Sequence, residues 1–182
     1  MSILFKRVFW VVCWAILAVV SQFVYAESTC PDGLENTIPD EDLVEYEGGE
    51  ILHVPSNLVF MRCTIGQQWD GDTCIGDAEP YSWQQALALS VGYQFNEKNS
   101  WRLPNVKELA VIVERACVRP SISEDSFPKT PADDFWTSTP SMLDEQRAWS
   151  LTFTNGSSAI KAKDRDIFVR LVRTRLPNEP IE

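Results

Sequence analysis

Residues 100–110 read SWRLPNVKELA, and this stretch carries the clearest helix-start signal in the chain. Pro104 stands ahead of Asn105, whose side chain can cap a helix, and Glu108 follows three residues later, which is the spacing of a capping box. Four apolar residues then repeat at i, i+3, i+4 and i+7, the period of a buried helical face: Leu109, Ile112, Val113 and Ala116. The stretch therefore predicts the entrance of a helix that packs against a core.

A second helix is predicted upstream of this stretch. Ser82, with Gln85 three residues later, forms another capping box. Apolar residues at helical spacing accompany it: Trp83, Ala86, Leu87 and Val91. Further upstream, residues 51–62 (ILHVPSNLVFMR) predict two short strands, with Pro55 and Asn57 in the turn between them.

The downstream part of the chain has the pattern of a sheet. Residues 147–154 (RAWSLTFT) alternate, which places three apolar residues on one face: Trp149, Leu151 and Phe153. Asn155-Gly156 is the strongest two-residue hairpin signal, and residues 167–173 (IFVRLVR) are apolar enough for a central strand. Two helices ahead of mainly antiparallel strands predict a single α+β unit.

Residues 1–26 predict a cleavable export signal. A basic pair precedes an apolar run over residues 8–20, and Val24 and Ala26 occupy the two positions that a signal peptidase reads. The alternative is an uncleaved membrane anchor, which needs about 20 apolar residues. The run here is shorter and is interrupted by Ser21. We expect cleavage after Ala26 and an exported protein.

Charge narrows the classes of partner. Loss of the signal removes Lys6 and Arg7 but no acid, so the remaining 156 residues carry a formal charge of −12. Nucleic acids and anionic membranes require clustered Lys and Arg, and we expect neither as a partner. No second hydrophobic span follows, so no membrane insertion is expected after signal cleavage. A chain of this length suits one domain.

Four cysteines follow the predicted signal: Cys30, Cys63, Cys74 and Cys117. An even number in an exported chain predicts two disulfides, with three possible connectivities. The segment between Cys63 and Cys74 (TIGQQWDGDT) holds two glycines and an Asp-Gly step that suit a tight excursion. We therefore pair Cys63 with Cys74 and Cys30 with Cys117. A zinc site is the alternative, but no two of these cysteines are separated by two residues and no histidine lies near them.

An ordered series of motifs resembles one bacterial family, the Lcl C-terminal domain family, formerly of unknown function. The motifs are LVFMRC, GQQWDGDTCIGDA, YSWQQAL, SWRLPNVKELAVIV, FPKTPADDFWTSTP, AWSLTFTNG and VRLVR. WRLP with the closing VRLVR also resembles the pattern shared by C-type-lectin-like folds and formylglycine-generating enzymes. The resemblance implies a compact, disulfide-stapled C-type-lectin-like domain, a scaffold that usually binds and only sometimes catalyses.

We expect four segments along the chain. They are the signal peptide at residues 1–26, an acidic and largely irregular arm at 27–50, the family domain at 51–175 and a short tail at 176–182. An export signal ahead of this family indicates a Gram-negative bacterium, with the protein in the periplasm, secreted or at the cell surface.

Trp101 and Arg102 allow two interpretations. The ring could stack on a sugar while the guanidinium grips an acidic group. The favoured interpretation is structural, with Trp101 in the core and Arg102 paired internally, because the family motif joins a loop to a helix. Trp149 and Arg170 belong to the same structural set, and Arg170 and Arg173 should point to opposite faces of their strand.

Three further groups are candidate binding residues. Asp70, Asp72, Asp77 and Glu79 lie around two glycines, the kind of oxygen-rich loop that calcium requires, although acidic loops are more often simply solvated. Trp136, Ser138 and Thr139 combine a flat ring with hydroxyls, as glycan and protein contacts do, or else pack internally. Lys161 and Lys163, with Arg165 and Arg170, could form a basic patch on folding.

No catalytic constellation accompanies the single histidine, His53, so no enzyme activity and no cofactor beyond calcium are expected. Two hypotheses remain. The first is a secreted or surface-associated module that binds a glycan or extracellular polymer in adhesion, as adhesive members of the family imply. The second is a structural or accessory subunit of a cell-surface assembly, bound to other exported proteins. The sequence leaves the oligomeric state open.

Overall fold

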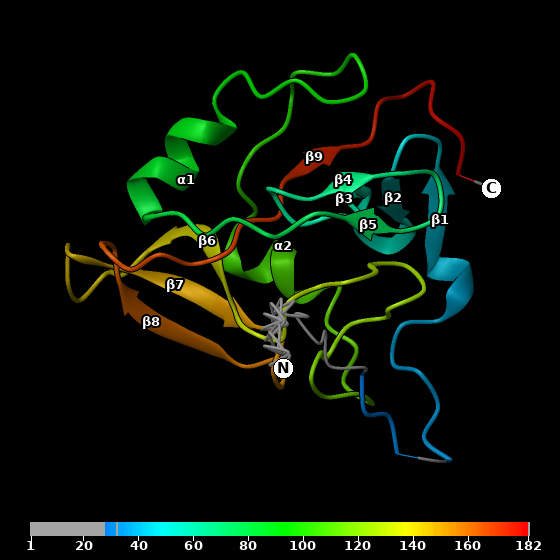
Figure 1. The fold of residues 1–182 in the computed structure, drawn as a ribbon, viewed down its shortest axis with the longest axis horizontal. Helices are drawn as coiled ribbons and strands as arrows, with labels where there is room; N and C mark the ends of the chain where they lie inside the picture. Colours follow the sequence, from blue (N-terminus) through cyan, green and yellow to red (C-terminus); the bar gives the residue numbers. More distant parts are fainter. Residues whose placement is uncertain (1–27, 32, 182) are drawn as a thin grey trace, which may run out of the picture.

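Two antiparallel sheets organise the chain in the computed structural model, which describes residues 28–31 and 33–181. The predicted signal peptide lies outside these residues. The first sheet has the order β1-β2-β3-β9 (Figure 1) and consists of β1 (Leu43–Tyr46), β2 (Glu50–His53), β3 (Leu58–Met61) and β9 (Val172–Thr174). The second is a meander of β6 (Asp134–Pro140), β7 (Arg147–Thr152) and β8 (Ser158–Ala162).

The predicted pair of strands in residues 51–62 is confirmed as β2 and β3, with the one-turn 3-10 helix η2 (Val54–Ser56) between them. Asn57 closes the turn in the left-handed region, with φ of 56°. Both strands are buried on both faces, since Ile51 and Phe60 face one core cluster while Leu52 and Val59 face the other. Burial on both sides explains their continuous apolar sequence.

The two predicted helices are confirmed as α1 (Trp83–Ser90) and α2 (Val106–Ala110), and each begins with the expected capping box. The Ser82 hydroxyl accepts a hydrogen bond from the Gln85 backbone, and the Asn105 side chain accepts from the Glu108 backbone. α2 is shorter than the apolar pattern predicts. The chain turns after Ala110, yet the rest of the apolar set stays buried: Leu109, Ile112, Val113 and Ala116.

The N-terminal arm is more regular than predicted. Residues 40–46 form the one-turn 3-10 helix η1 (Asp40–Asp42) and strand β1, because β1 can add to the exposed edge of β2. Glu114 holds the preceding segment in place. Its buried carboxylate accepts hydrogen bonds from the backbone N–H groups of Thr37, Ile38 and Ala116 and from the Thr37 hydroxyl.

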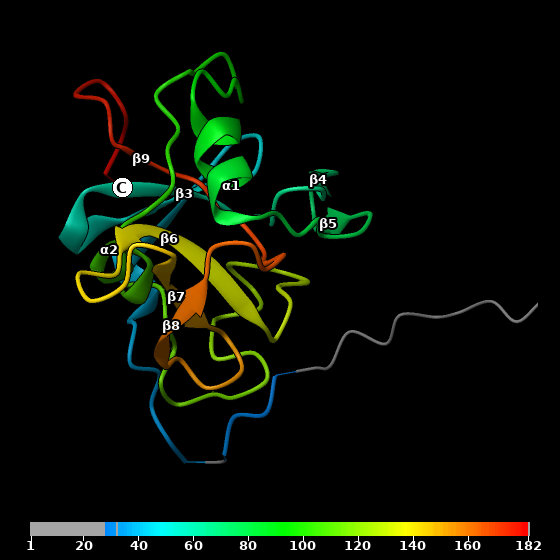
Figure 2. The same ribbon diagram turned by 90° about the vertical axis from the view of Figure 1, so that its left-hand side faces the viewer.

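Both predicted disulfides are present. Cys30 joins Cys117, which fixes the start of the arm to the end of the α2 region, and Cys63 joins Cys74. The second bridge closes a hairpin of β4 (Gln68–Trp69) and β5 (Cys74–Ile75). Figure 2 shows this hairpin standing out to one side of the domain.

Two predictions for the second half of the chain are wrong in detail. The loop between β7 and β8 is longer than the two residues Asn155-Gly156, because Phe153 leaves the strand and packs edge-on against Phe135 in the core. The central strand predicted at residues 167–173 is reduced to the short β9, which lies at the edge of its sheet and forms an isolated bridge from Val172 to Arg102.

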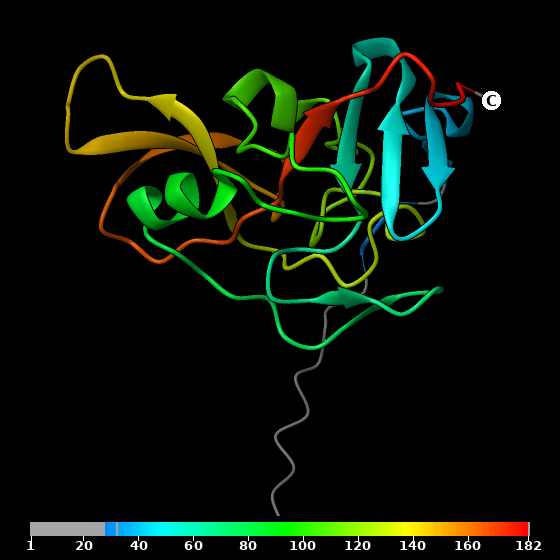
Figure 3. The ribbon, with the colours of Figure 1, turned by 90° about the horizontal axis from the view of Figure 1, so that it is seen from above.

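Different elements form the two ends of the domain. The β6–β7 hairpin reaches out beside α1, whereas β1 and the C-terminal segment lie at the opposite end (Figure 3). Within residues 28–31 and 33–181, no helix is long and apolar enough to cross a membrane.

Candidate functional site

The segment at residues 100–110 has a structural role. Trp101 is 2% exposed, and its indole N–H donates to the Phe95 carbonyl at 3.3 Å. The Arg102 guanidinium binds both carboxylate oxygens of Glu108, at 2.7 and 2.8 Å. Glu108 also accepts from the Asn105 backbone, and the hydrogen bond from Arg102 is the largest cause that lowers its pKa. The motif thus joins a loop, a helix cap and β9.

Arg170 and Arg173 are both fully buried, and they occupy separate environments. Arg170 donates to the Met61 carbonyl and the Thr130 hydroxyl, each at 2.7 Å, and also to the Arg62 carbonyl. Because desolvation disfavours its charge, burial lowers the pKa of Arg170 to about 9. The group remains protonated at neutral pH and cross-links the segments around it.

Arg173 instead enters an internal ion network. It pairs with Glu50 and with Glu179 of the C-terminal tail, and Lys98 adds a second cation 3.0 Å from the Glu50 carboxylate. The tail from residue 176 onward is therefore bound to the domain. Neither Arg170 nor Arg173 is available to a ligand at the surface.

The predicted aromatic surface around Trp136 is not formed. The Trp136 side chain is fully buried, and its indole N–H donates to the Tyr81 carbonyl at 2.8 Å. The Thr139 hydroxyl accepts from the Val106 backbone at the start of α2, and the Ser138 backbone donates to the Pro104 carbonyl. These groups hold β6 against α1 and α2, so the internal alternative is correct.

The predicted basic patch is not formed either. Arg170 is buried, and Lys161 forms an ion pair with Asp134 at 2.8 Å. The Lys163 ammonium donates to the Glu145 carbonyl at 2.7 Å and lies 4.2 Å from the centre of the Trp83 ring. The positive charges therefore do not gather on one surface, which opposes binding of a sulfated polyanion there.

The predicted calcium residues are not assembled as a cation site. One Asp70 oxygen accepts from the backbone N–H groups of Thr73 and Asp72, and these hydrogen bonds lower the pKa of Asp70. Glu79 instead accepts from the Tyr81 hydroxyl at 2.6 Å, which raises the pKa of Tyr81 to about 12. Among the described residues, no three His, Cys, Asp or Glu side chains group so as to hold a metal ion; Asp77 belongs to no such group.

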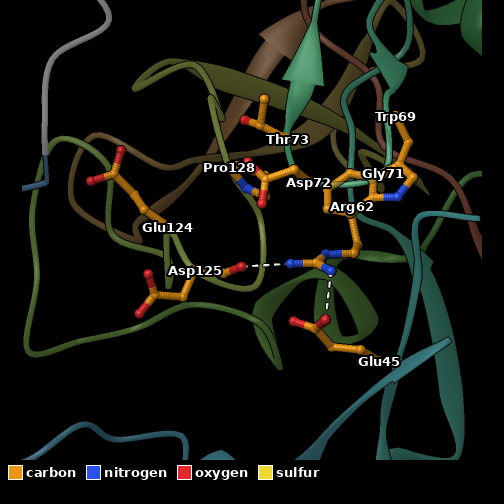
Figure 4. A pocket seen from close by; sticks show the side chains of 9 residues that line it. All are labelled: Glu45, Arg62, Trp69, Gly71, Asp72, Thr73, Glu124, Asp125 and Pro128. Carbon is orange, nitrogen blue, oxygen red and sulfur yellow. Dashed lines mark hydrogen bonds and ion pairs between the residues drawn. The ribbon is translucent and has the colours of Figure 1, made fainter. Parts of the chain in front are cut away.

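A pocket of about 420 Å³ lies between the β4–β5 hairpin and the loop at residues 124–128 (Figure 4). Four segments form it: β1, Arg62 at the end of β3, the disulfide-closed hairpin and the loop that precedes β6. Its lining combines one aromatic ring, one cation, four carboxylates and a hydroxyl, and consists of Glu45, Arg62, Trp69, Gly71, Asp72, Thr73, Glu124, Asp125 and Pro128.

Arg62 fixes the geometry of this pocket. Its guanidinium lies 4.2 Å from the centre of the Trp69 ring and forms a 2.8 Å ion pair with Glu45. It also donates to the backbone carbonyls of Ser126 at 2.8 Å and Asp125 at 2.6 Å, so it ties the loop to the hairpin. With only 6% of its side chain exposed, Arg62 acts as part of the wall rather than as a free anion receptor.

The electrostatics of the pocket are acidic. The lining holds four carboxylates and one guanidinium, and of the four only Glu45 pairs with Arg62. The Glu124 carboxylate points away from Arg62 and accepts from the Ser28 backbone at 2.6 Å, while Asp72 and Asp125 are exposed at the rim (Figure 4). Carboxylates accept hydrogen bonds from hydroxyl and ammonium groups, and an indole ring offers a flat apolar face. The arrangement can therefore receive a polyhydroxylated or cationic ligand, and it repels anions.

Sequence reasoning did not identify Arg62, Trp69, Glu124 or Asp125 as site residues. A signal was present, since Trp69 lies inside the acidic segment QQWDGD that the Cys63–Cys74 bridge closes. The partner loop is 50 residues further on, and no local pattern indicates that it returns to this place. A second pocket, of about 300 Å³, shares Glu124 and Asp125 with the first and borders the Cys30–Cys117 bridge.

His53 takes no part in either pocket. It is nearly buried at the end of β2, and its ring Nδ1 lies 2.8 Å from the Ser56 hydroxyl of the adjoining turn. Desolvation by burial lowers the pKa of His53. The ring therefore stabilises a local turn.

Comparison with known proteins places the domain in a family. No curated protein sequence matches the chain significantly. The model of the Lcl C-terminal domain matches residues 49–173, which include every strand from β2 to the middle of β9, both helices and the Cys63–Cys74 bridge. This match covers well over half of the 182 residues, and the chain belongs to the Lcl C-terminal domain family.

Proposed function

We propose that this protein is an exported, non-enzymatic binding module with a C-type-lectin-like fold, and that it attaches to a glycan or extracellular polymer. The observation that carries the proposal is the pocket between the β4–β5 hairpin and the 124–128 loop. Two disulfides support a location outside the cytoplasm, because thiols are kept reduced inside it.

The pocket favours a particular class of glycan. Sugar hydroxyls are hydrogen-bond donors to carboxylates, and sugar rings stack on indole faces. An amino sugar adds charge complementarity with the exposed carboxylates of Asp72 and Asp125. Neutral and amine-bearing glycans should therefore bind, and sulfated or carboxylated glycans should not.

A glycan array probed with the purified, oxidised protein tests the proposal. The variant Asp72→Asn/Asp125→Asn removes two pocket charges while it keeps the size of both side chains. The variant Asp164→Asn/Asp166→Asn is the matched control, because both residues are exposed and neither lines the pocket. Binding of amine-bearing glycans should fall at least tenfold in the pocket variant and remain unchanged in the control.

Two outcomes would contradict the proposal. Equal loss in both variants would indicate a general charge effect, and preference for sulfated glycans would conflict with an acidic pocket. The same array with calcium and then with EDTA tests whether a cation takes part. We propose that binding needs no cofactor, so that EDTA leaves it unchanged.

A second candidate function is that of an accessory subunit in a cell-surface assembly. One observation favours it: two adjacent apolar side chains, Met142 and Leu143, are almost fully exposed at the tip of the β6–β7 hairpin. Binding at this tip and binding in the pocket are compatible, because the two surfaces share no residue.

A further inference from the structure

The tip of the β6–β7 hairpin is an unusual surface. Met142 is 92% exposed and Leu143 is 93% exposed, the highest fractions among the large apolar side chains of the described residues. The hairpin projects from one end of the domain (Figure 3), and neither side chain belongs to a core cluster. The fold gains no packing from them.

The loop that carries this pair is held in one conformation. The buried Ser141 hydroxyl accepts hydrogen bonds from the backbone N–H groups of Leu143 at 3.2 Å and Asp144 at 3.3 Å. At the other end, Asp144 forms an ion pair with Arg147 at 3.1 Å and accepts from the Gln146 backbone at 2.9 Å. The apolar pair is therefore presented on a preformed turn.

Lys163, which directly follows β8, also holds this turn in place. Its ammonium donates to the Glu145 carbonyl at 2.7 Å, and its backbone N–H donates to the Gln146 carbonyl at 2.9 Å. The same ammonium lies over the Trp83 ring at the start of α1. A preformed loop loses little conformational entropy when it binds, which increases affinity.

We infer that Met142 and Leu143 form a docking knob for another protein, which offers an apolar pocket with a Lys or Arg at its rim. This inference names the contact surface of the accessory-subunit candidate and is independent of the glycan pocket. A Leu side chain fills an apolar pocket, and Met adapts to its irregularities. Glu145 is exposed beside the pair, and Asp144 is already paired with Arg147. We therefore expect the Lys or Arg of the partner to bind Glu145.

Charge argues against the other occupants of such a knob. A second copy of this chain carries the same formal charge of −12 after signal removal, and like charge opposes self-association. Anionic membrane surfaces attract polybasic segments, whereas the charges of this turn are mixed: Asp144 pairs with Arg147, Glu145 is exposed, and the Lys163 ammonium is bound to the Glu145 carbonyl. A basic-rimmed protein pocket satisfies both the apolar pair and its acidic neighbour.

The probe is a phage-displayed library of random 12-residue peptides, panned on the purified, oxidised protein. Selected peptides should combine apolar side chains with Lys or Arg. Their affinity should fall at least tenfold for Met142→Ser/Leu143→Ser and about threefold for Glu145→Gln. The control variant is Val91→Ser, which removes another exposed apolar side chain, 82% exposed, and should not change affinity.

Four results would overturn the inference. They are selected peptides that bind the double Ser variant as well as wild type, selected peptides rich in acids, tip-dependent self-association in sedimentation velocity, and tip-dependent binding to phosphatidylcholine vesicles. The variant Asp72→Asn/Asp125→Asn should keep its peptide affinity. The knob and the glycan pocket can therefore fail separately.

Discussion

Glu50 and Arg173 form an ion pair inside the domain, with both side chains fully withdrawn from solvent. The pair bridges β2 and β9, which lie on either side of β3, and Glu179 and Lys98 complete the network. Burial removes water from the charges, so each depends on its partners for stabilisation. The network fixes the C-terminal tail to the sheet.

Breaking this pair should destabilise the domain strongly. Glu50→Ala leaves Arg173 without its buried partner, and we expect a loss of about 3 to 5 kcal/mol in the free energy of unfolding. Replacing both residues, as in Glu50→Leu/Arg173→Met, should cost less than the single change, because the fully buried guanidinium is removed with its partner and Glu179 keeps Lys98 at 3.6 Å. Urea unfolding of the three proteins measures the difference, and a double variant less stable than the single would contradict the account.

Stability should decline in acid through Glu114. Burial raises the pKa of this carboxyl, but hydrogen bonds from Thr37, Ala116 and Ile38 outweigh it and bring the pKa below its ordinary value. The ionised form therefore stabilises the fold above the unfolded pKa of about 4.3, and this contribution is lost as the pH falls through the folded pKa.

Substitution of Glu114 tests this contribution. Glu114→Gln should lower the unfolding free energy at pH 7 by about 2 kcal/mol, the effect of losing hydrogen bonds to a charged group. The gap from wild type should narrow as the pH falls from the unfolded pKa of about 4.3 through the lower folded pKa, because the wild-type carboxylate is then itself protonated. Glu41→Gln, at an exposed position, is the control. A gap that is constant from pH 7 to pH 3 would exclude this role for the charge.

The two disulfides should differ in their contribution. Cys30–Cys117 spans 87 residues and Cys63–Cys74 spans 11. In the chain-entropy model, the longer loop contributes about 4.5 kcal/mol and the shorter about 3 kcal/mol. Unfolding of Cys30→Ser/Cys117→Ser and of Cys63→Ser/Cys74→Ser compares them directly. A larger loss from the shorter loop would show that local packing, not chain entropy, dominates.

Gly156 should tolerate no side chain. Its φ is 73°, and an added Cβ would lie 2.4 Å from the Val113 side chain. Gly92 is the matched control, with φ of 71° and open space around it. Gly156→Ala should destabilise the domain by at least about 1 kcal/mol more than Gly92→Ala, because only the first substitution adds a steric clash in the core. Equal effects in thermal unfolding would contradict the tight contact.

The fold was largely predictable because its signals are local. The capping boxes at Ser82 and Asn105 mark both helices correctly, and the turn at Asn57 separates β2 from β3 as expected. The pattern in β7 was less reliable. Ala148 and Ser150 are buried while Trp149 is only half-buried, so the face predicted to be apolar is not the more buried one along the whole strand.

The candidate site was not predictable in the same way. Trp136 lies in a polar stretch that resembles an exposed loop, yet tertiary packing against Tyr81 buries it. Arg62, at the end of β3, lies over the Trp69 ring of the hairpin, and both meet Asp125 from a loop more than 50 residues away. Such meetings depend on chain topology, which spacing and composition do not encode.

The most direct measurement is isothermal titration calorimetry of the oxidised protein with three oligosaccharides. Chitosan oligosaccharides carry amines, chitin oligosaccharides are neutral, and hyaluronan oligosaccharides are acidic. We predict that chitosan binds most tightly, chitin more weakly and hyaluronan not at all. The chitosan affinity should fall at least tenfold in Asp72→Asn/Asp125→Asn, which corresponds to about 1.4 kcal/mol. Tightest binding of hyaluronan, or chitosan binding that the pocket variant leaves unchanged, would contradict the proposed site.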